Sequence, residues 1–241
     1  MESIKALLWV YRASWSRSVE LLAGNWAIIF APLAYSIIIS IAGVILSRFG
    51  LIGGMLLTAV SAACASSGLY LLDNVVRMGK ANLNDFLKGF SVYLGDILTI
   101  AFILWIPMML LSRFAYTTPE GSFIILAVQL LLYVFLNPVP ELIYQGRVSG
   151  LALLSASYEF IVANWIEWFI PNVLITAAGW LLLRWLSQAA SYLPFFLDSL
   201  FILAGIGLFL TFLMIFRGVL FSELSGTTRR SRLFRYRSRG G

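Results

Sequence analysis

The chain has 241 residues, of which 61% are hydrophobic and 12% are charged, and its formal net charge at pH 7 is +6. Soluble domains are about half apolar and about a quarter charged, so this composition excludes an ordinary soluble domain and predicts a single membrane domain. Histidine is absent and Cys64 is the single cysteine. A disulfide within the chain and a metal site built from Cys and His are therefore excluded.

The first 22 residues have the pattern of an amphipathic helix. An apolar stripe lies opposite a polar face that contains Lys5, Arg12 and Glu20. Arg12 and Arg17 follow the short apolar run 6–11, where a signal peptide would have its small-residue cleavage site, so we interpret this segment as mature protein. A helix of this kind lies in the plane of the membrane interface. The same pattern returns at 83–94 and at 151–161, each time directly before an apolar run.

Six apolar runs are long enough to cross a bilayer, which requires about 20 residues. They lie near 25–47, 52–76, 95–112, 122–143, 164–188 and 195–221. The sequence therefore predicts an all-α fold, a polytopic bundle of about six transmembrane helices with three amphipathic interfacial helices. The predicted membrane domain covers 1–222, and 223–241 form a basic cytoplasmic tail.

The basic residues are distributed unevenly between the two sides of this predicted arrangement. If the N-terminus is cytoplasmic, 14 of the 17 Lys and Arg residues fall on the inner side, and only Arg48, Arg113 and Arg184 do not. Because inner loops carry an excess of Lys and Arg, both termini are expected in the cytoplasm. Arginine is also much more frequent than lysine in this chain.

Two segments of the chain match at a constant offset, the 139 residues from Asn25 to Asn164. The identical positions are Ser16, Ser18, Glu20, Asn25, Trp26, Phe30 and Pro32, paired with Ser155, Ser157, Glu159, Asn164, Trp165, Phe169 and Pro171. A looser match around Asp96 completes three predicted units, at about 1–78, 79–146 and 147–222. Each unit would hold an interfacial helix, a polar elbow and two spans.

The elbow residues have an expected structural role. Backbone donors lose their partners where an in-plane helix turns into a span, and Asn25, Asp96 or Asn164 can cap the new helix there. Trp26 and Trp165 are expected to anchor the elbows at the headgroup depth.

This order of features resembles the glycerophosphodiester phosphodiesterase membrane domain and related uncharacterised bacterial six-span families. The residues that carry the resemblance are 20–32, 86–96 and 137–146, continuing to Asn164 and Trp165. The resemblance implies a helix bundle without chemistry of its own, because the reaction in those phosphodiesterases belongs to a separate soluble domain. Together with the preference for arginine over lysine, the resemblance also implies a bacterial inner membrane.

Few ionisable or strongly polar residues lie at membrane depth, and these are the candidates for a polar cavity. Asp73, Gln129 and Glu141 could line such a cavity, because Pro138 and Pro140 must break the fourth span beside Glu141. The alternative is that the prolines only end the span and Glu141 lies among headgroups, paired with Arg147 or Arg77. Asp73 and Arg77, four residues apart, could also pair along one helix face.

The tail places aromatic residues among six arginines, Arg229, Arg230, Arg232, Arg235, Arg237 and Arg239. Basic residues just inside a final span attract anionic lipids. Arginine beside aromatic rings also suits nucleic acid, but we favour lipid headgroups, with a partner protein as the next choice.

No set of residues with the spacing of a catalytic site occurs, and no cofactor fingerprint is present. We therefore expect a protein that is not an enzyme and has no cofactor: a noncatalytic scaffold, assembly factor or subunit of a membrane complex that binds lipids and other membrane proteins. A stripe of small residues from Gly54 to Gly68 could receive a neighbouring helix of this chain or of another protein. The alternative function is a transporter or permease for a small solute or lipid.

Overall fold

The computed structural model describes residues 2–115, 117–118, 120–146, 148–192 and 194–238, and all regular structure in these ranges is helical. The elements are α1 (Glu2–Gly24), η1 (Trp26–Phe30), α2 (Ala31–Leu46), η2 (Ser47–Phe49), α3 (Gly50–Asp73), η3 (Asn74–Met78), α4 (Leu83–Val92), α5 (Leu94–Ala115), α6 (Gly121–Phe135), α7 (Val139–Glu141), η4 (Leu142–Gly146), α8 (Leu151–Ala190), α9 (Phe195–Leu224) and α10 (Arg229–Ser238). The all-α prediction is confirmed.

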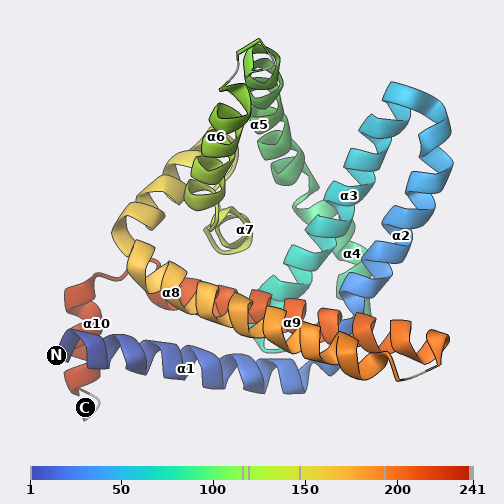
Figure 1. Cartoon of the computed structure of the whole chain (residues 1–241). Coiled ribbons are helices and arrows are strands. Elements are labelled where there is room, and N and C mark those ends of the chain that lie inside the picture. The colour runs from blue at the N-terminus through green and yellow to red at the C-terminus, as the bar shows by residue number, and fades with distance from the viewer. Residues whose placement is uncertain (1, 116, 119, 147, 193, 239–241) are drawn as a thin grey trace.

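Within the described ranges, five continuous helical stretches are long and apolar enough to cross a membrane. They are Trp26–Met78, Leu94–Ala115, Gly121–Gly146, Leu151–Ala190 and Leu197–Leu224. The first holds 53 residues and reverses direction near Gly50, so that α2 and α3 run antiparallel (Figure 1). The turn consists of the short 3₁₀ segment η2 and of Gly50, whose backbone angles (φ 55°, ψ −128°) are not helical. The sequence pattern divides this stretch into two spans at the same place.

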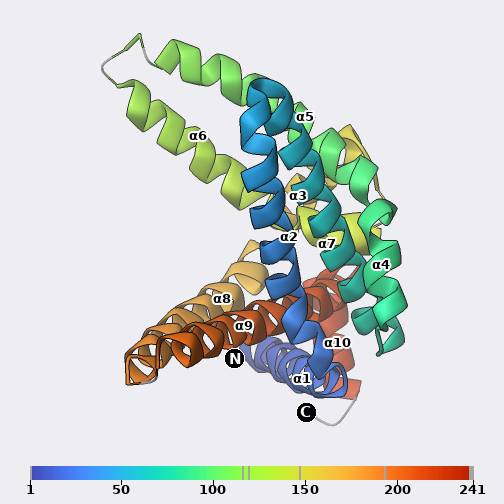
Figure 2. The same cartoon turned by 90° about the vertical axis from the view of Figure 1, so that its right-hand side faces the viewer.

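The long helices form three hairpins, α2–α3, α5–α6 and α8–α9, that diverge from a common base (Figures 1 and 2). Two of the hairpin tips are tight because glycine occupies the point of closest approach. A Cβ atom at Gly53 would lie 1.9 Å from the Leu46 carbonyl oxygen, and one at Gly121 would lie 1.6 Å from that of Ala115. No larger residue fits either position without moving the backbone.

Amphipathic helix α4 packs along α3 at the base of the first hairpin. It begins with a reciprocal capping box, in which the Asn82 side chain accepts from the backbone of Asp85 and the Asp85 carboxylate accepts from the backbone of Asn82. Two serines of α3 then fix its position: Ser66 Oγ donates to Gly89 O at 2.6 Å, and Ser67 Oγ donates to Phe86 O at 2.7 Å. The predicted amphipathic segment at 83–94 thus forms a separate helix that ends at Val92.

The other two predicted amphipathic segments differ in how they join the helices that follow. Helix α1 covers nearly the whole first segment and ends at Gly24, directly before Asn25. The third segment and the fifth predicted span merge into α8, which bends at Asn164, the single residue inside it with non-helical backbone angles (φ −133°, ψ 18°).

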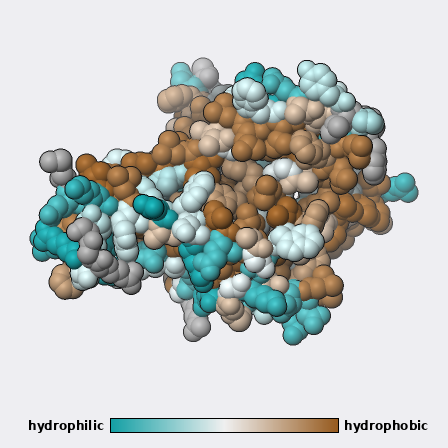
Figure 3. Space-filling model, turned by 90° about the horizontal axis from the view of Figure 1, so that it is seen from below, coloured by the Kyte–Doolittle hydropathy of each residue, from teal (hydrophilic) through white to brown (hydrophobic). Residues whose placement is uncertain are grey.

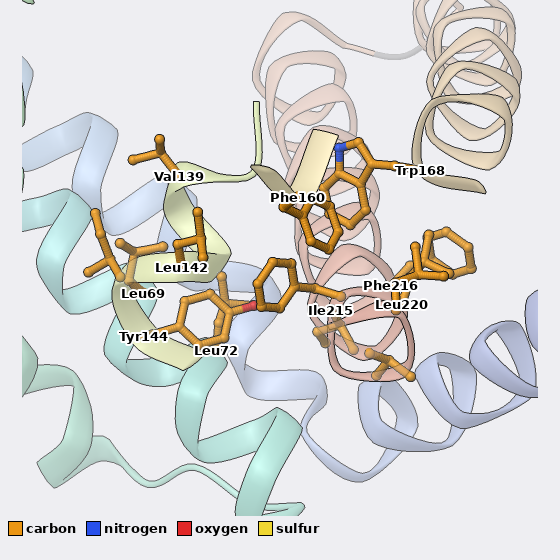
Figure 4. Packing of buried hydrophobic residues seen from close by; sticks show 14 of the residues in the cluster. Leu69, Leu72, Val139, Leu142, Tyr144, Phe160, Trp168, Ile215, Phe216 and Leu220 are labelled. Atoms are coloured by element: carbon orange, nitrogen blue, oxygen red, sulfur yellow. The ribbon is translucent and has the colours of Figure 1, made fainter. Parts of the chain in front are cut away.

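The hydrophobic core lies at the base, where α3, α7, η4, α8 and α9 meet (Figure 4). Trp168 is fully buried there, and its ring packs edge-on against Phe160, with 5.3 Å between the ring centroids. The hairpin arms carry many exposed apolar side chains instead, among them Leu51, Phe123 and Trp185. Seen from below, hydrophilic residues gather at the end formed by α10 and the start of α1 (Figure 3). The base is therefore packed like a protein interior, whereas the arms present apolar surface outward.

Candidate functional site: polar clusters beside an apolar cavity

A buried ion pair joins the proline-containing break after α6 to helix α9. Arg217 Nε lies 2.8 Å from Glu141 Oε1, and a second guanidinium nitrogen donates to Oε2 at 3.0 Å. The Glu141 side chain is fully buried and that of Arg217 is 14% exposed. Two charges at this depth are stable only when they satisfy each other. The expected alternative partner Arg77 is wrong, because it pairs with Asp73 instead, and Arg147 lies outside the described residues.

Arg217 makes two further contacts near this ion pair. It donates to the Asn137 carbonyl oxygen at 2.6 Å, and its guanidinium lies 5.2 Å from the ring centroid of Trp168. Trp168 in turn donates from Nε1 to Asn137 Oδ1 at 2.8 Å. Helix α6 ends at Phe135, shortly before Pro138 and Pro140. The bonds to Trp168 and Arg217 fix the residues around this break to α8 and α9. This arrangement is that of a structural brace, because its hydrogen bonds tie the break to both α8 and α9.

A second polar cluster lies where α3 ends and η3 begins, near the base. Arg77 forms an ion pair with Asp73 one helical turn earlier, as predicted, and the Tyr93 hydroxyl donates to Asp73 Oδ2 at 3.0 Å. Burial raises the pKa of Tyr93 above its usual value, and the nearby negative charge of Asp73 adds to this effect. The phenol therefore remains a hydrogen-bond donor to the carboxylate at neutral pH.

Two π-helical turns, η3 and η4, face each other across this cluster. Arg77 belongs to η3 and donates to the backbone carbonyl of Tyr144 in η4. Such turns widen the helix and leave carbonyl groups without their usual partners, and they often mark functional sites. Here the widened turns bring the Arg77 guanidinium next to the Tyr144 carbonyl group, which accepts a hydrogen bond from it.

Two cavities adjoin these turns. The larger, about 540 Å³, is lined almost entirely by apolar side chains from all three hairpins, including Ile28, Leu69, Ile97, Ile143 and Met214. The smaller, about 400 Å³, is polar and is lined by Asp73, Arg77, Val92, Tyr93, Asp96, Ile143, Tyr144, Val148 and Ser149. Ile143 belongs to both linings, so the apolar cavity and the polar cavity are neighbours.

The two elbow asparagines have closely similar local structures. Asn25 has φ −130° and ψ 35°, close to the values of Asn164 given above, and both side chains are 5% exposed. Asn25 Nδ2 donates to Leu21 O at 2.8 Å, and Asn164 Nδ2 donates to Phe160 O at 3.2 Å, in each case four residues back. The expectation that they cap the new helix is wrong for Asn25, whose side chain makes no bond to the following amides. The bend also leaves backbone carbonyl groups at the end of the preceding helical segment without their usual partners. The side-chain amides of Asn25 and Asn164 each donate to one of these carbonyl groups.

The second partner of each elbow differs. Asn25 also donates to Gly79 O at 2.9 Å and accepts from Ala81 N at 2.9 Å, which ties the elbow to the connection after η3. Asn164 Oδ1 accepts from Arg232 of the tail at 3.2 Å. Asp96 lies in the first turn of α5, where a negative charge is favourable, and makes no such bond to any described residue. Trp26 and Trp165 are 65% and 56% exposed beside their asparagines, where an interface anchor would have to lie.

The basic tail forms helix α10, which folds back onto α1 and α8. Arg229 Nε lies 2.6 Å from Glu167 Oε1, and Arg232 reaches the same oxygen at 3.4 Å. Arg235 pairs with Glu223 and Arg237 with Glu2. Burial lowers the pKa of Arg232, an effect that Glu167 opposes, and the guanidinium stays charged. Four tail arginines are thus engaged within the chain; Arg230 has no such pair in the described part, and Arg239 lies outside the described residues.

The three residues predicted to line one polar cavity lie in different surroundings. Asp73 lines the polar cavity, Glu141 is buried in its ion pair, and Gln129 is exposed on α6. The prediction is wrong in joining them, because the divergence of the hairpins carries α6 away from the base. Sequence reasoning used Arg217 only for orientation. Its position as a lone cation within the apolar run before α9 ends could have indicated that it needs a buried partner.

Among the described residues, no group of three or more His, Cys, Asp or Glu side chains could hold a metal ion. Comparison with models of protein families, with curated proteins and with solved structures finds no match. The resemblance to the phosphodiesterase membrane domain therefore stays a prediction, and the function has to be inferred from the geometry.

Proposed function

We propose that the chain crosses a membrane six times, as three units of one interfacial helix, one elbow and one hairpin. The 53-residue helical stretch supports this count, because its two antiparallel arms can each cross once. The matching elbows support the repeat. Further support comes from Gly79, Gly150 and Gly226, which have φ of 77°, 63° and 69° and follow the second arm of each hairpin.

In this proposal the base faces the cytoplasm of a bacterial cell and the three hairpin tips lie outside. The uneven distribution of Lys and Arg supports this orientation. The start of α1 and the end of α10 lie on the base side (Figure 1), so that N- and C-termini would be cytoplasmic.

The function that we propose is that of a noncatalytic scaffold, assembly factor or subunit of a membrane complex. The observation that carries it is the divergence of the hairpins, whose arms bury little surface against one another. Leu51 is 83% exposed, and Phe123 and Trp185 are each 72% exposed. Lipids cover such side chains, but arms that diverge also leave room for the helices of other membrane proteins. The carboxylates Asp73, Glu141 and Glu167 are all paired with arginines, which favours a structural role for them.

The test is purification from native membranes in nanodiscs, followed by crosslinking and mass spectrometry. A companion recovered in a fixed ratio, with crosslinks to the arms of the hairpins, is the expected result. Recovery of the chain alone or only with copies of itself would contradict the scaffold proposal.

A transporter for a lipid or small solute is the second candidate, and the apolar cavity between the hairpins favours it. It requires that residues of the arms become accessible from the aqueous side. Single cysteines along α3, α6 and α9, in a Cys64→Ser background, would be labelled by aqueous thiol reagents in a transporter. Complete protection of all positions would exclude this function.

A further inference from the structure

We propose that the apolar cavity and the polar cavity together bind one phospholipid whose headgroup carries a primary ammonium group, with an acyl chain in the apolar cavity and the headgroup in the polar one. The inference rests on the proposal that the chain spans a membrane, and it goes beyond it by naming a ligand and its site.

The two cavities meet along a single border. Three elements contribute consecutive residues to opposite sides of it: Leu72 and Asp73 on α3, Asp96 and Ile97 on α5, and Ile143 and Tyr144 on η4. Leu72, Ile97 and Ile143 line the apolar cavity. Their neighbours Asp73, Asp96 and Tyr144 line the polar cavity. A ligand that occupies both must therefore be apolar at one end and polar at the other.

The apolar cavity fits a hydrocarbon chain. Its volume of about 540 Å³ lies within the range of about 300–1,000 Å³ for small-molecule sites. Thr211 is the only lining side chain besides Tyr35 that carries a polar atom, so the lining selects against water-soluble ligands. The lining draws on all three hairpins, as expected for a chain held at the point where they diverge.

The charged residues of the polar cavity fit a headgroup that carries both a positive and a negative charge. Asp73 is already engaged by Arg77 and Tyr93, whereas Asp96 makes no hydrogen bond or ion pair within the described residues. Its carboxylate can accept from an ammonium group. Arg77 is 36% exposed, and its Nε and Nη2 are used by Asp73 and Tyr144. The remaining nitrogen can donate to a phosphate. Choline cannot donate such a hydrogen bond, and glycerol has no positive charge.

The test is native mass spectrometry of the full chain, released in mild detergent from nanodiscs that contain equal amounts of phosphatidylethanolamine, phosphatidylcholine and phosphatidylglycerol. One bound phospholipid per chain is expected, with phosphatidylethanolamine enriched about tenfold, the ratio that one charge-assisted hydrogen bond supports. Bound lipid in the proportions of the nanodisc would overturn the proposal.

Two variants separate headgroup from chain. Asp96→Asn is expected to retain one lipid but to lose the enrichment. Ala101→Phe, which fills the apolar cavity, is expected to lower retention of all three lipids at least fivefold. The control is Asp198→Asn, a carboxylate in the first turn of α9 that lines neither cavity, and it should behave as the wild type.

Size-exclusion chromatography first establishes that each variant is folded, and Asp96→Asn keeps the proposal falsifiable if Ala101→Phe is not. An enrichment that survives Asp96→Asn would overturn the assignment of the headgroup site. The purified chain is measured without companions, so failure here leaves the scaffold proposal standing, and failure to find companions leaves lipid binding standing.

Discussion

The elbows at Asn25 and Asn164 have the same backbone bend and the same bond to a carbonyl four residues back, but they are held by different neighbours. The first is tied to backbone atoms of Gly79 and Ala81, which lead from the first hairpin into α4. The elbow at Asn164 is tied to the side chain of Arg232, which follows the last hairpin. Both partners come just after the second arm of the hairpin that the elbow begins.

The difference shows how a chain can end such an arrangement. After the first hairpin the following connection supplies neutral backbone groups, which depend little on salt. After the last hairpin α10 supplies guanidinium groups, and Glu167 holds two of them at the elbow. Charge-assisted bonds are stronger individually but partly exposed ones are screened by salt. The third elbow should therefore be the more sensitive of the two to ionic strength.

The largest effect is expected from Arg217→Met, which breaks the buried ion pair at the base and touches neither elbow. It leaves Glu141 buried without a partner, at a cost of about 3–5 kcal/mol. Thermal unfolding in detergent should show a large fall in Tm. The double variant Glu141→Met, Arg217→Met is the control and should recover much of the loss. Equal stability of the single and double variants would show that the pair is not coupled.

Asn25→Ala should come next, because it removes three hydrogen bonds at a buried position and leaves backbone groups of Leu21, Gly79 and Ala81 unsatisfied. We expect a loss of about 1–3 kcal/mol, measured as a fall in Tm that is the same at low and high salt. A loss that changes with salt would contradict the neutral character of this elbow.

Asn164→Ala should cost less, about 0.5–1.5 kcal/mol. Arg232 retains Glu167 and both oxygens of Thr227 as acceptors, so no charge is left alone. The same unfolding measurement on both asparagine variants compares the elbows directly. A larger loss at Asn164 than at Asn25 would reverse the proposed ranking.

Glu167→Gln should have the smallest effect on stability, about 0.5–1 kcal/mol. Arg229 is largely exposed, and buried Arg232 keeps Asn164 and Thr227 as acceptors, while the new amide oxygen can still accept from it. Its effect on α10 should be larger than its effect on the fold, and trypsin should cleave the tail of the variant several times faster than that of the wild type. Raising the salt concentration should speed cleavage of the wild-type tail in the same way. Glu159→Gln, an exposed carboxylate on the same helix, is the control. Unchanged cleavage would mean that Glu167 does not hold the tail.

Local patterns predicted much of this fold. The apolar runs, the amphipathic segment that becomes α4 and the bends at Asn25 and Asn164 depend on neighbouring residues, and the sequence contains that information. The sequence did not predict the partners of the buried polar residues. Glu141 pairs with Arg217 and not with Arg77 because of how distant helices pack. The direction of the Asn25 bonds was likewise set by the approach of Gly79 and Ala81, which no local pattern contains. The divergence of the hairpins also depends on contacts between units.

The most direct test of the account is the side of the membrane on which each hairpin tip lies. Single cysteines at Arg48, Thr117 and Tyr192, in a Cys64→Ser background, mark the three tips, and cysteines at Lys80, Ser149 and Thr228 mark the base. In intact cells an impermeant thiol reagent should label all three tips, and it should label the base positions only after the membrane is permeabilised. A tip that is labelled together with the base positions would contradict the account of three hairpins crossing from one side.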